Sequence, residues 1–213
     1  MTWRGPIVLA LLLALGVGGG YVASWALGGH PQAVGAAQPV TAASPSLPVD
    51  PVPELFADPA FDPLPTDLEL VRQEVGRGDF RLSLEVPKGW RVSPNSLSEW
   101  QWRPPDFEPF GYYLRVEQVL SNRRSIDWTL DRRIDELNED EAAVKVIEQT
   151  DDSLHFSYVT SNHLRHGFLT WLDLSGSDNA QVEVAVTGRK ADVEGMADLI
   201  SRVADSMVMG RQS

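Results

Sequence analysis

Residues 80–90 read FRLSLEVPKGW and carry the strand signal from which the fold of the chain can be worked out. The apolar positions are Phe80, Leu82, Leu84 and Val86, and polar residues stand between them. A period of two is typical of a strand that buries one face. Pro87 and Gly89 then favour a turn. The stretch therefore predicts one half-buried strand that ends at a tight turn.

The rest of the C-terminal part shows two patterns: the period of two that is typical of strands and the spacing of three to four residues that is typical of helices. Alternating apolar residues predict further strands around residues 100–102, 112–116, 144–146, 154–158, 168–174 and 182–186. Two stripes with helical spacing predict two helices. They are Ile126, Leu130, Ile134 and Leu137, and Val193, Met196, Leu199, Ile200 and Val203. Three strands, a helix, four strands and a helix, joined by short turns, predict an α+β domain with an antiparallel sheet covered by two helices.

A known family shares this order of elements. The strand that runs into Val86-Pro87-Lys88-Gly89-Trp90 resembles the start of the Mog1/PsbP-like α/β/α sandwich, and the closing helix near Asp205-Ser206-Met207-Val208 is similar to its end. The resemblance covers about residues 79–209. It implies a sandwich of the kind found in actinobacterial envelope proteins of the LpqN type, with a general binding role and no catalytic positions. Lipidated members carry a Cys, which this chain lacks.

The N-terminal end indicates a membrane segment. Residues 7–27 are uncharged, and 21 helical residues span ~30 Å, the thickness of a hydrocarbon core. Arg4 precedes them, so the positive-inside rule predicts a short cytoplasmic N-terminus at 1–6 and a C-terminal part outside the membrane. The rival interpretation is a cleaved signal peptide, and the domain is then secreted.

A proline-rich segment and an acidic domain follow. Residues 28–65 contain nine of the 15 Pro residues, which predicts an extended, disordered tether that leads to a domain at 66–213. The net charge is −12, which argues against nucleic acid as a partner. The chain has no Cys, so disulfides and Cys-ligated metals are excluded.

Aromatic residues gather between residues 90 and 113. Trp100, Trp102 and Tyr112 fit the buried face of strands, whereas the Pro-bounded loop at 103–113 places aromatic side chains where a partner can reach them. Arginine and aromatic side chains are typical of protein interfaces. The candidate partner-contact residues are Trp102, Arg103, Phe107, Phe110, Tyr113 and Arg115.

Catalytic and metal-binding motifs do not stand out. His155, His163 and His166 fall on one expected hairpin, but no third ligand has metal-site spacing, and solvated or core histidines are the simpler interpretation. Hydrolase, P-loop and dinucleotide motifs are missing. We therefore expect no cofactor, no metal and no enzyme activity, but a non-catalytic binding or accessory module for an envelope protein. The alternatives are a carrier or sensor of a small apolar or glycan ligand, and a hydrolase with an unrecognised site.

Overall fold

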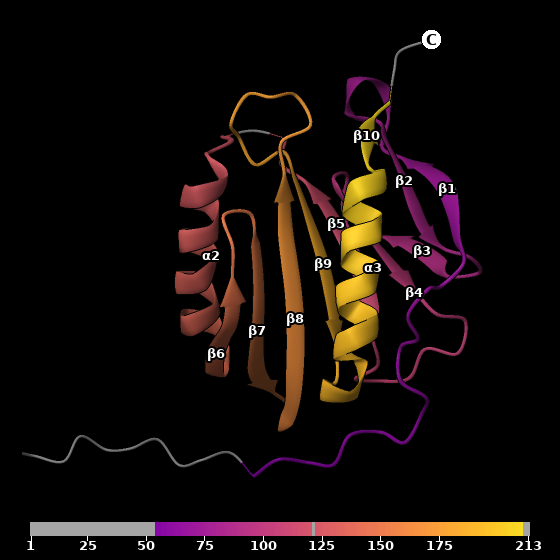
Figure 1. Cartoon of the computed structure of the whole chain (residues 1–213), viewed down its shortest axis with the longest axis vertical. Helices are drawn as coiled ribbons and strands as arrows, with labels where there is room; N and C mark the ends of the chain where they lie inside the picture. The colour runs from indigo at the N-terminus through magenta and orange to yellow at the C-terminus, as the bar shows by residue number, and fades with distance from the viewer. Residues whose placement is uncertain (1–53, 121, 211–213) are drawn as a thin grey trace, which may run out of the picture. The chain divides into compact units, whose positions relative to one another are not determined.

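The computed structural model describes residues 54–120 and 122–210 (Figure 1). The predicted cytoplasmic N-terminus, the predicted membrane segment at 7–27 and the first part of the predicted tether lie outside this range. Within it, no helix has the length and apolar character needed to cross a membrane.

A seven-stranded sheet forms the centre of the domain. Its order is β3-β4-β5-β9-β8-β7-β6, and every neighbouring pair is antiparallel. The strands are β3 (Arg91–Pro94), β4 (Glu99–Arg103), β5 (Tyr113–Gln118), β6 (Ala142–Gln149), β7 (Ser153–Thr160), β8 (His163–Leu172) and β9 (Val182–Gly188). The predicted α+β class and the antiparallel pairing are confirmed.

A second, three-stranded sheet was not predicted. It has the order β1-β2-β10 and consists of β1 (Leu70–Val75), β2 (Leu82–Pro87) and β10 (Val208–Met209). The prediction of one sheet is therefore wrong, because β2 pairs with β1 and β10 and not with the strands that follow it. Phe80, predicted to point inward, belongs to the 3-10 helix η1 (Gly78–Phe80) and is 47% exposed.

The two helices pack on opposite faces of the large sheet, because the core that α3 joins contains Val184 and Val186 of β9, whereas the cluster under α2 contains Ala185. Helix α3 (Val193–Ser206), preceded by the short helix η2 (Lys190–Asp192), packs between the large sheet and β2. Its buried stripe joins the main core, and the predicted core positions Met196, Leu199, Ile200 and Val203 are confirmed. Apolar residues of this core come from β2, β4, β5, β9 and α3. Burial of such side chains stabilises the fold by about 1.5–3 kcal/mol each.

Helix α2 (Ile126–Asp140) covers only part of the other face. Leu130 is buried, and Ile126, Ile134 and Leu137 pack around it against β7 and β8. The hydroxyl of Ser125 accepts a hydrogen bond from the Trp128 backbone N–H at 3.3 Å and caps the helix. The sheet face beside α2 is where several of the candidate residues lie.

Candidate functional site

The six candidate residues occupy three different environments. Trp102 is fully buried, and its indole N–H donates to Gln73 at 3.0 Å, so its side chain belongs to the core and is not available at the surface. Side chains alternate along a strand. Because Trp102 and Leu114 point into the core, Arg103, Tyr113 and Arg115 lie on the opposite face of the large sheet.

That opposite face is the one on which α2 packs. The register aligns Arg115 with Ala185 and Ala185 with Leu169, and Leu169 belongs to the cluster under α2. Helix α2 lies over β6, β7 and β8, and the described part of the chain contains no other helix on that side. We call the uncovered region over β4 and β5 the open face. Its exposed or half-buried side chains are those of Arg103, Tyr113, Arg115 and Glu117, and the buried Gln101 lies among them.

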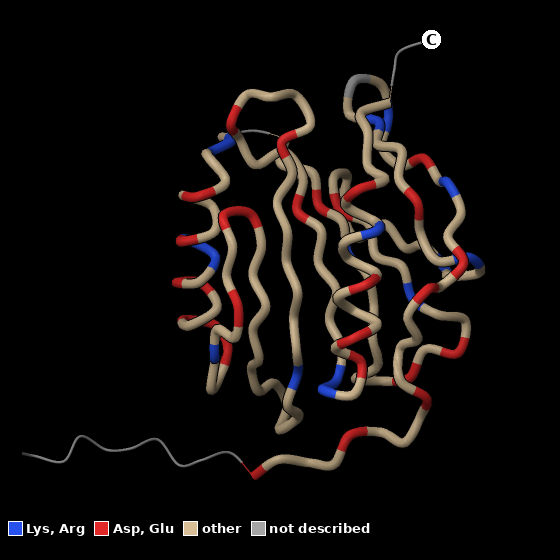
Figure 2. The backbone as a smooth tube through the Cα atoms, viewed as in Figure 1, with Lys and Arg blue, Asp and Glu red and all other residues tan. Residues whose placement is uncertain are grey.

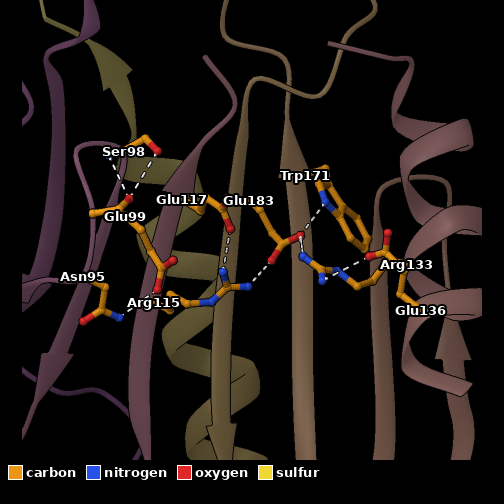
Figure 3. Close-up of polar contacts among 10 residues, drawn as sticks. Asn95, Ser98, Glu99, Arg115, Glu117, Arg133, Glu136, Trp171 and Glu183 are labelled. Carbon is orange, nitrogen blue, oxygen red and sulfur yellow. Dashed lines mark hydrogen bonds and ion pairs between the residues drawn. The ribbon is translucent and has the colours of Figure 1, made fainter. Parts of the chain in front are cut away.

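A buried carboxylate connects the open face with α2 (Figure 3). The side chain of Glu183 on β9 is 5% exposed and accepts hydrogen bonds from Arg115, from Arg133 at 2.7 Å and from the indole N–H of Trp171 at 3.0 Å. Arg115 also donates to Glu117 at 2.7 Å. One carboxylate thus holds two arginines from a strand and a helix.

The charges around Arg115 keep it ionised and in place. Burial alone would lower the pKa of Arg115, but Glu183 and Glu117 outweigh burial and raise it. The Arg115 side chain is only 21% exposed. It therefore presents a fixed cation at the centre of the open face, with little rotamer freedom left to lose on binding.

Arg103 and Phe107 extend the open face toward the 103–113 loop. The Arg103 guanidinium donates to Gln101 at 2.8 Å and lies 4.8 Å from the centroid of the Phe107 ring. A cation over an aromatic face is attracted by its quadrupole. The pair therefore joins the loop to the sheet.

Phe110 does not belong to the open face, because its side chain lies against His163 on β8. Its ring stacks on His163 with centroids 4.0 Å apart, and its backbone is in the left-handed region at φ 62°. Arg165, which is buried, donates to the carbonyl groups of Phe110 and Gly111. Phe110 therefore fastens the loop to β8, and of the six candidates only Arg103, Phe107, Tyr113 and Arg115 gather on or beside the open face.

Residues 54–64 form a strap that runs along the end of the large sheet (Figure 1). The strap falls within the predicted disordered tether, but it is hydrogen-bonded to the domain through Arg189, Asp192 and Asn162. Between the strap and the 103–113 loop lies a cavity of about 270 Å³ that Phe61, Phe107 and Tyr112 help to line. Ordered structure thus begins before the predicted boundary at residue 66.

A histidine pair lies on the α3 side of the large sheet. His155 Nε2 and His166 Nδ1 are 3.2 Å apart, and the Phe168 ring stacks on His155 at 3.9 Å. Burial lowers the pKa of both imidazoles, helped by their mutual repulsion for His155 and by Lys190 and Arg165 for His166. The pair is therefore neutral near pH 7. No group of three or more potential metal-ligating residues occurs among the described residues.

The pair predicts acid sensitivity. Histidine in the unfolded chain titrates near 6.5, and the folded pKa values lie lower, so the unfolded chain binds more protons as the pH falls below about 6.5. The free energy of unfolding should therefore fall between pH 7 and pH 5. Urea unfolding across this range measures it. A His155→Gln/His166→Gln double variant should show a flatter profile, and an equally steep profile would contradict the assignment.

A second cavity is relevant to the alternative function as a carrier of an apolar ligand. A cavity of about 590 Å³ is lined in part by Phe80, Leu97, Trp100 and Leu120. This cavity lies between η1 and the β3–β4 turn. The carrier function stays a prediction.

Comparisons with known proteins give a loose likeness to solved structures. No protein-family model matches the chain, and no curated protein matches it. The fold is similar to the crystal structure of LpqN, described as involved in cell envelope biogenesis of Mycobacterium tuberculosis. The TM-score is 0.42 and the identity 14%, over 67% of this chain and 92% of that one. The likeness is limited to the general arrangement of the fold, and membership of the Mog1/PsbP-like family stays a prediction.

Proposed function

We propose that the chain is a membrane-anchored, extracytoplasmic binding or accessory module of the cell envelope that acts without catalysis. Its partner is a protein that docks on the open face. The observation that carries the proposal is the fixed set of arginine and aromatic side chains on a sheet region that α2 leaves uncovered.

The chemistry of the open face suits a protein surface. Arginine and tyrosine are enriched where interfaces bind most strongly, and side chains held in one geometry before binding lose less entropy. Arg115 is held by Glu117 and Glu183, and Arg103 by Gln101 and Phe107. The sheet supplies a rigid base, since Gln101 and Ala185 beneath these side chains are buried.

The location is proposed from the sequence. Residues 7–27 are long and apolar enough for a single span, and Arg4 before them favours an N-terminus in the cytoplasm. The acidic domain then lies outside the membrane, at the end of the proline-rich segment. Cleavage of residues 7–27 by a signal peptidase would give the same domain in a secreted form.

Variants of the open face test the proposal. Arg103→Glu with Tyr113→Ala should lower the recovery of a crosslinked partner from intact cells at least tenfold, because it reverses one fixed charge and removes an aromatic contact. The melting temperature should change little, since both side chains are at the surface. Arg132→Glu on α2 is the matched control, because Arg132 is exposed and lies outside the open face. Equal recovery from both variants would contradict the proposal.

A further inference from the structure

The domain recognises the strap mainly through the strap's backbone. Arg189 donates to the carbonyl groups of Pro59 at 2.8 Å, Phe61 at 3.0 Å and Asp62 at 3.1 Å. At the other end of the strap, the side-chain amide of Asn162 donates to the Glu54 carbonyl at 2.8 Å. The backbone carbonyl of Asn162 accepts from the Phe56 N–H, also at 2.8 Å. These contacts need an extended chain and do not depend on most of its side chains.

One aromatic side chain supplies the specific contact. The Phe61 ring lies 3.5 Å from the Arg189 guanidinium and edge-on to Tyr112, with ring centroids 6.0 Å apart. Phe56 lies edge-on to His163, but 59% of it is exposed. Phe61 is therefore the anchor, and Phe56 is an accessory contact.

The charges of the strap and its surroundings are complementary (Figure 2). The strap carries Glu54, Asp58 and Asp62 and no basic residue, whereas the chain as a whole has a net charge of −12. The elements beneath the strap carry Arg189 and Lys190 after β9. Asp58 is close enough to Arg189 to contribute to the raised pKa of its guanidinium. Asp192 already pairs with Arg189, so the further attraction for an acidic segment comes from Lys190 and from the contact between Asp58 and Arg189.

The strap has a fixed end and an exposed length. Leu64 is 3% exposed, its N–H donates to Asp192 at 3.0 Å, and its carbonyl lies against Gly195, where a Cβ would overlap it. The residues before it are exposed except for Pro59 and Phe61, which are half-buried. Leu64 therefore fixes one end of the strap in the core, and most residues from 54 to 62 remain at the surface.

We propose that this seat, formed by Tyr112, Asn162, His163 and Arg189, is a docking site for an acidic, proline-interrupted, extended segment of a partner protein. Residues 54–62 occupy the seat in cis as an exchangeable self-ligand. The segment in trans presents an aromatic side chain at the position of Phe61 and a proline within two residues of it, and its carbonyl groups accept from Arg189. The four seat residues differ from those of the open face, and the two sites adjoin at Phe107, which packs on Arg103 and also lines the cavity beside Phe61 and Tyr112. Substitutions that leave Phe107 in place therefore test each site by itself.

A labelled peptide tests the exchange in the full chain. The probe is a fluorescent synthetic peptide of residues 54–63. The receptor is a full chain in which residues 54–62 are replaced by glycine and serine, with Leu64 retained. The peptide should bind this chain saturably and bind the wild type at least tenfold more weakly, because the attached strap competes at high effective concentration. A Phe61→Ala peptide should bind at least tenfold more weakly, and added salt should weaken binding.

Further variants separate the outcomes. A full chain with only Phe61→Ala should hold its own strap less tightly than the wild type does. Its affinity for the peptide should lie between those of the wild type and the strap-replaced chain. The Arg103→Glu/Tyr113→Ala chain keeps its strap, so it should bind the peptide as weakly as the wild type does. Neither substituted side chain belongs to the seat. Equal binding to wild type and strap-replaced chains would overturn the proposal. It would also be overturned if neither folded variant bound the peptide, or if both variants failed to fold, since the strap would then be integral to the core.

Discussion

Replacing Arg189 with alanine should lower the free energy of unfolding by about 3–5 kcal/mol, the loss expected when one partner of a buried ion pair is removed. Arg189 is 2% exposed and Asp192 is fully buried. The five N–H groups of the guanidinium make five hydrogen bonds, two to Asp192 and three to strap carbonyls. Without them, the Asp192 carboxylate keeps only the backbone N–H donors of Leu64 and Arg189.

The Arg189–Asp192 pair should also make the free energy of unfolding depend on pH under acidic conditions. Burial alone would raise the pKa of the Asp192 carboxyl, but hydrogen bonds from Arg189 and from the Leu64 N–H hold it below its ordinary value. Its contribution is complete above the unfolded pKa of about 3.9 and is lost as the pH falls through the lower folded value.

Urea unfolding of matched variants measures the Arg189 effect. Arg132→Ala is the control, since it removes an arginine from an exposed i, i+4 pair and should cost about 0.3–0.5 kcal/mol. Arg189→Lys should also be strongly destabilising, because a single ammonium cannot reproduce the planar fork. A loss below 1 kcal/mol for Arg189→Ala would mean that the pair and the strap contribute little to the fold.

Replacing Glu183 with alanine should have an effect of similar size, about 3–5 kcal/mol, because Arg115 and Arg133 would lose the carboxylate that they share. The indole N–H of Trp171, which is 1% exposed, would also lose its acceptor. Helix α2 should loosen first, since Arg133 is its polar link to β9. Hydrogen exchange of α2 amides, together with urea unfolding, measures both effects.

Glu117→Ala is the matched control for Glu183. Glu117 pairs with the same arginine, but its side chain is 38% exposed, so its loss should cost less than about 1 kcal/mol. Glu183 does not need to touch the partner, yet Glu183→Ala should weaken partner capture because Arg115 would keep only the half-exposed Glu117 as its partner. Equal costs for the two glutamates would contradict the assignment of Glu183 as the residue that organises the open face.

Most of the elements that could be predicted from the sequence bury one face, although β6 was predicted at 144–146 and is almost wholly exposed. The stripes of α2 and α3 and the alternation in β4, β5, β7, β8 and β9 report burial directly. Strand β3 gave no such signal, because all four of its residues are exposed. The pairing of β2 with β1 and β10 could not be predicted, since the period of two reports a buried face and not which strand lies beside it.

The candidate site could be predicted only in part. Alternation was enough to place Trp102 on the buried face and Tyr113 opposite the core, but the contact of Phe110 with His163 depends on three-dimensional packing. Glu183 and Arg189 were missed, because their partners lie far away in the sequence. One signal was present: Glu183 stands between Val182 and Val184 in a central strand, where a charge needs a partner on the opposite face.

Site-specific photo-crosslinking in cells that produce the chain tests the open face as the partner-binding surface most directly. A photoreactive residue at Tyr113 should capture one defined protein, and the Arg103→Glu substitution in the same chain should abolish the product. The same residue at Trp128, which is 52% exposed on α2, is the control position and should not capture that protein. Capture of the same protein from both positions, or from Tyr113 regardless of Arg103→Glu, would contradict docking on the open face.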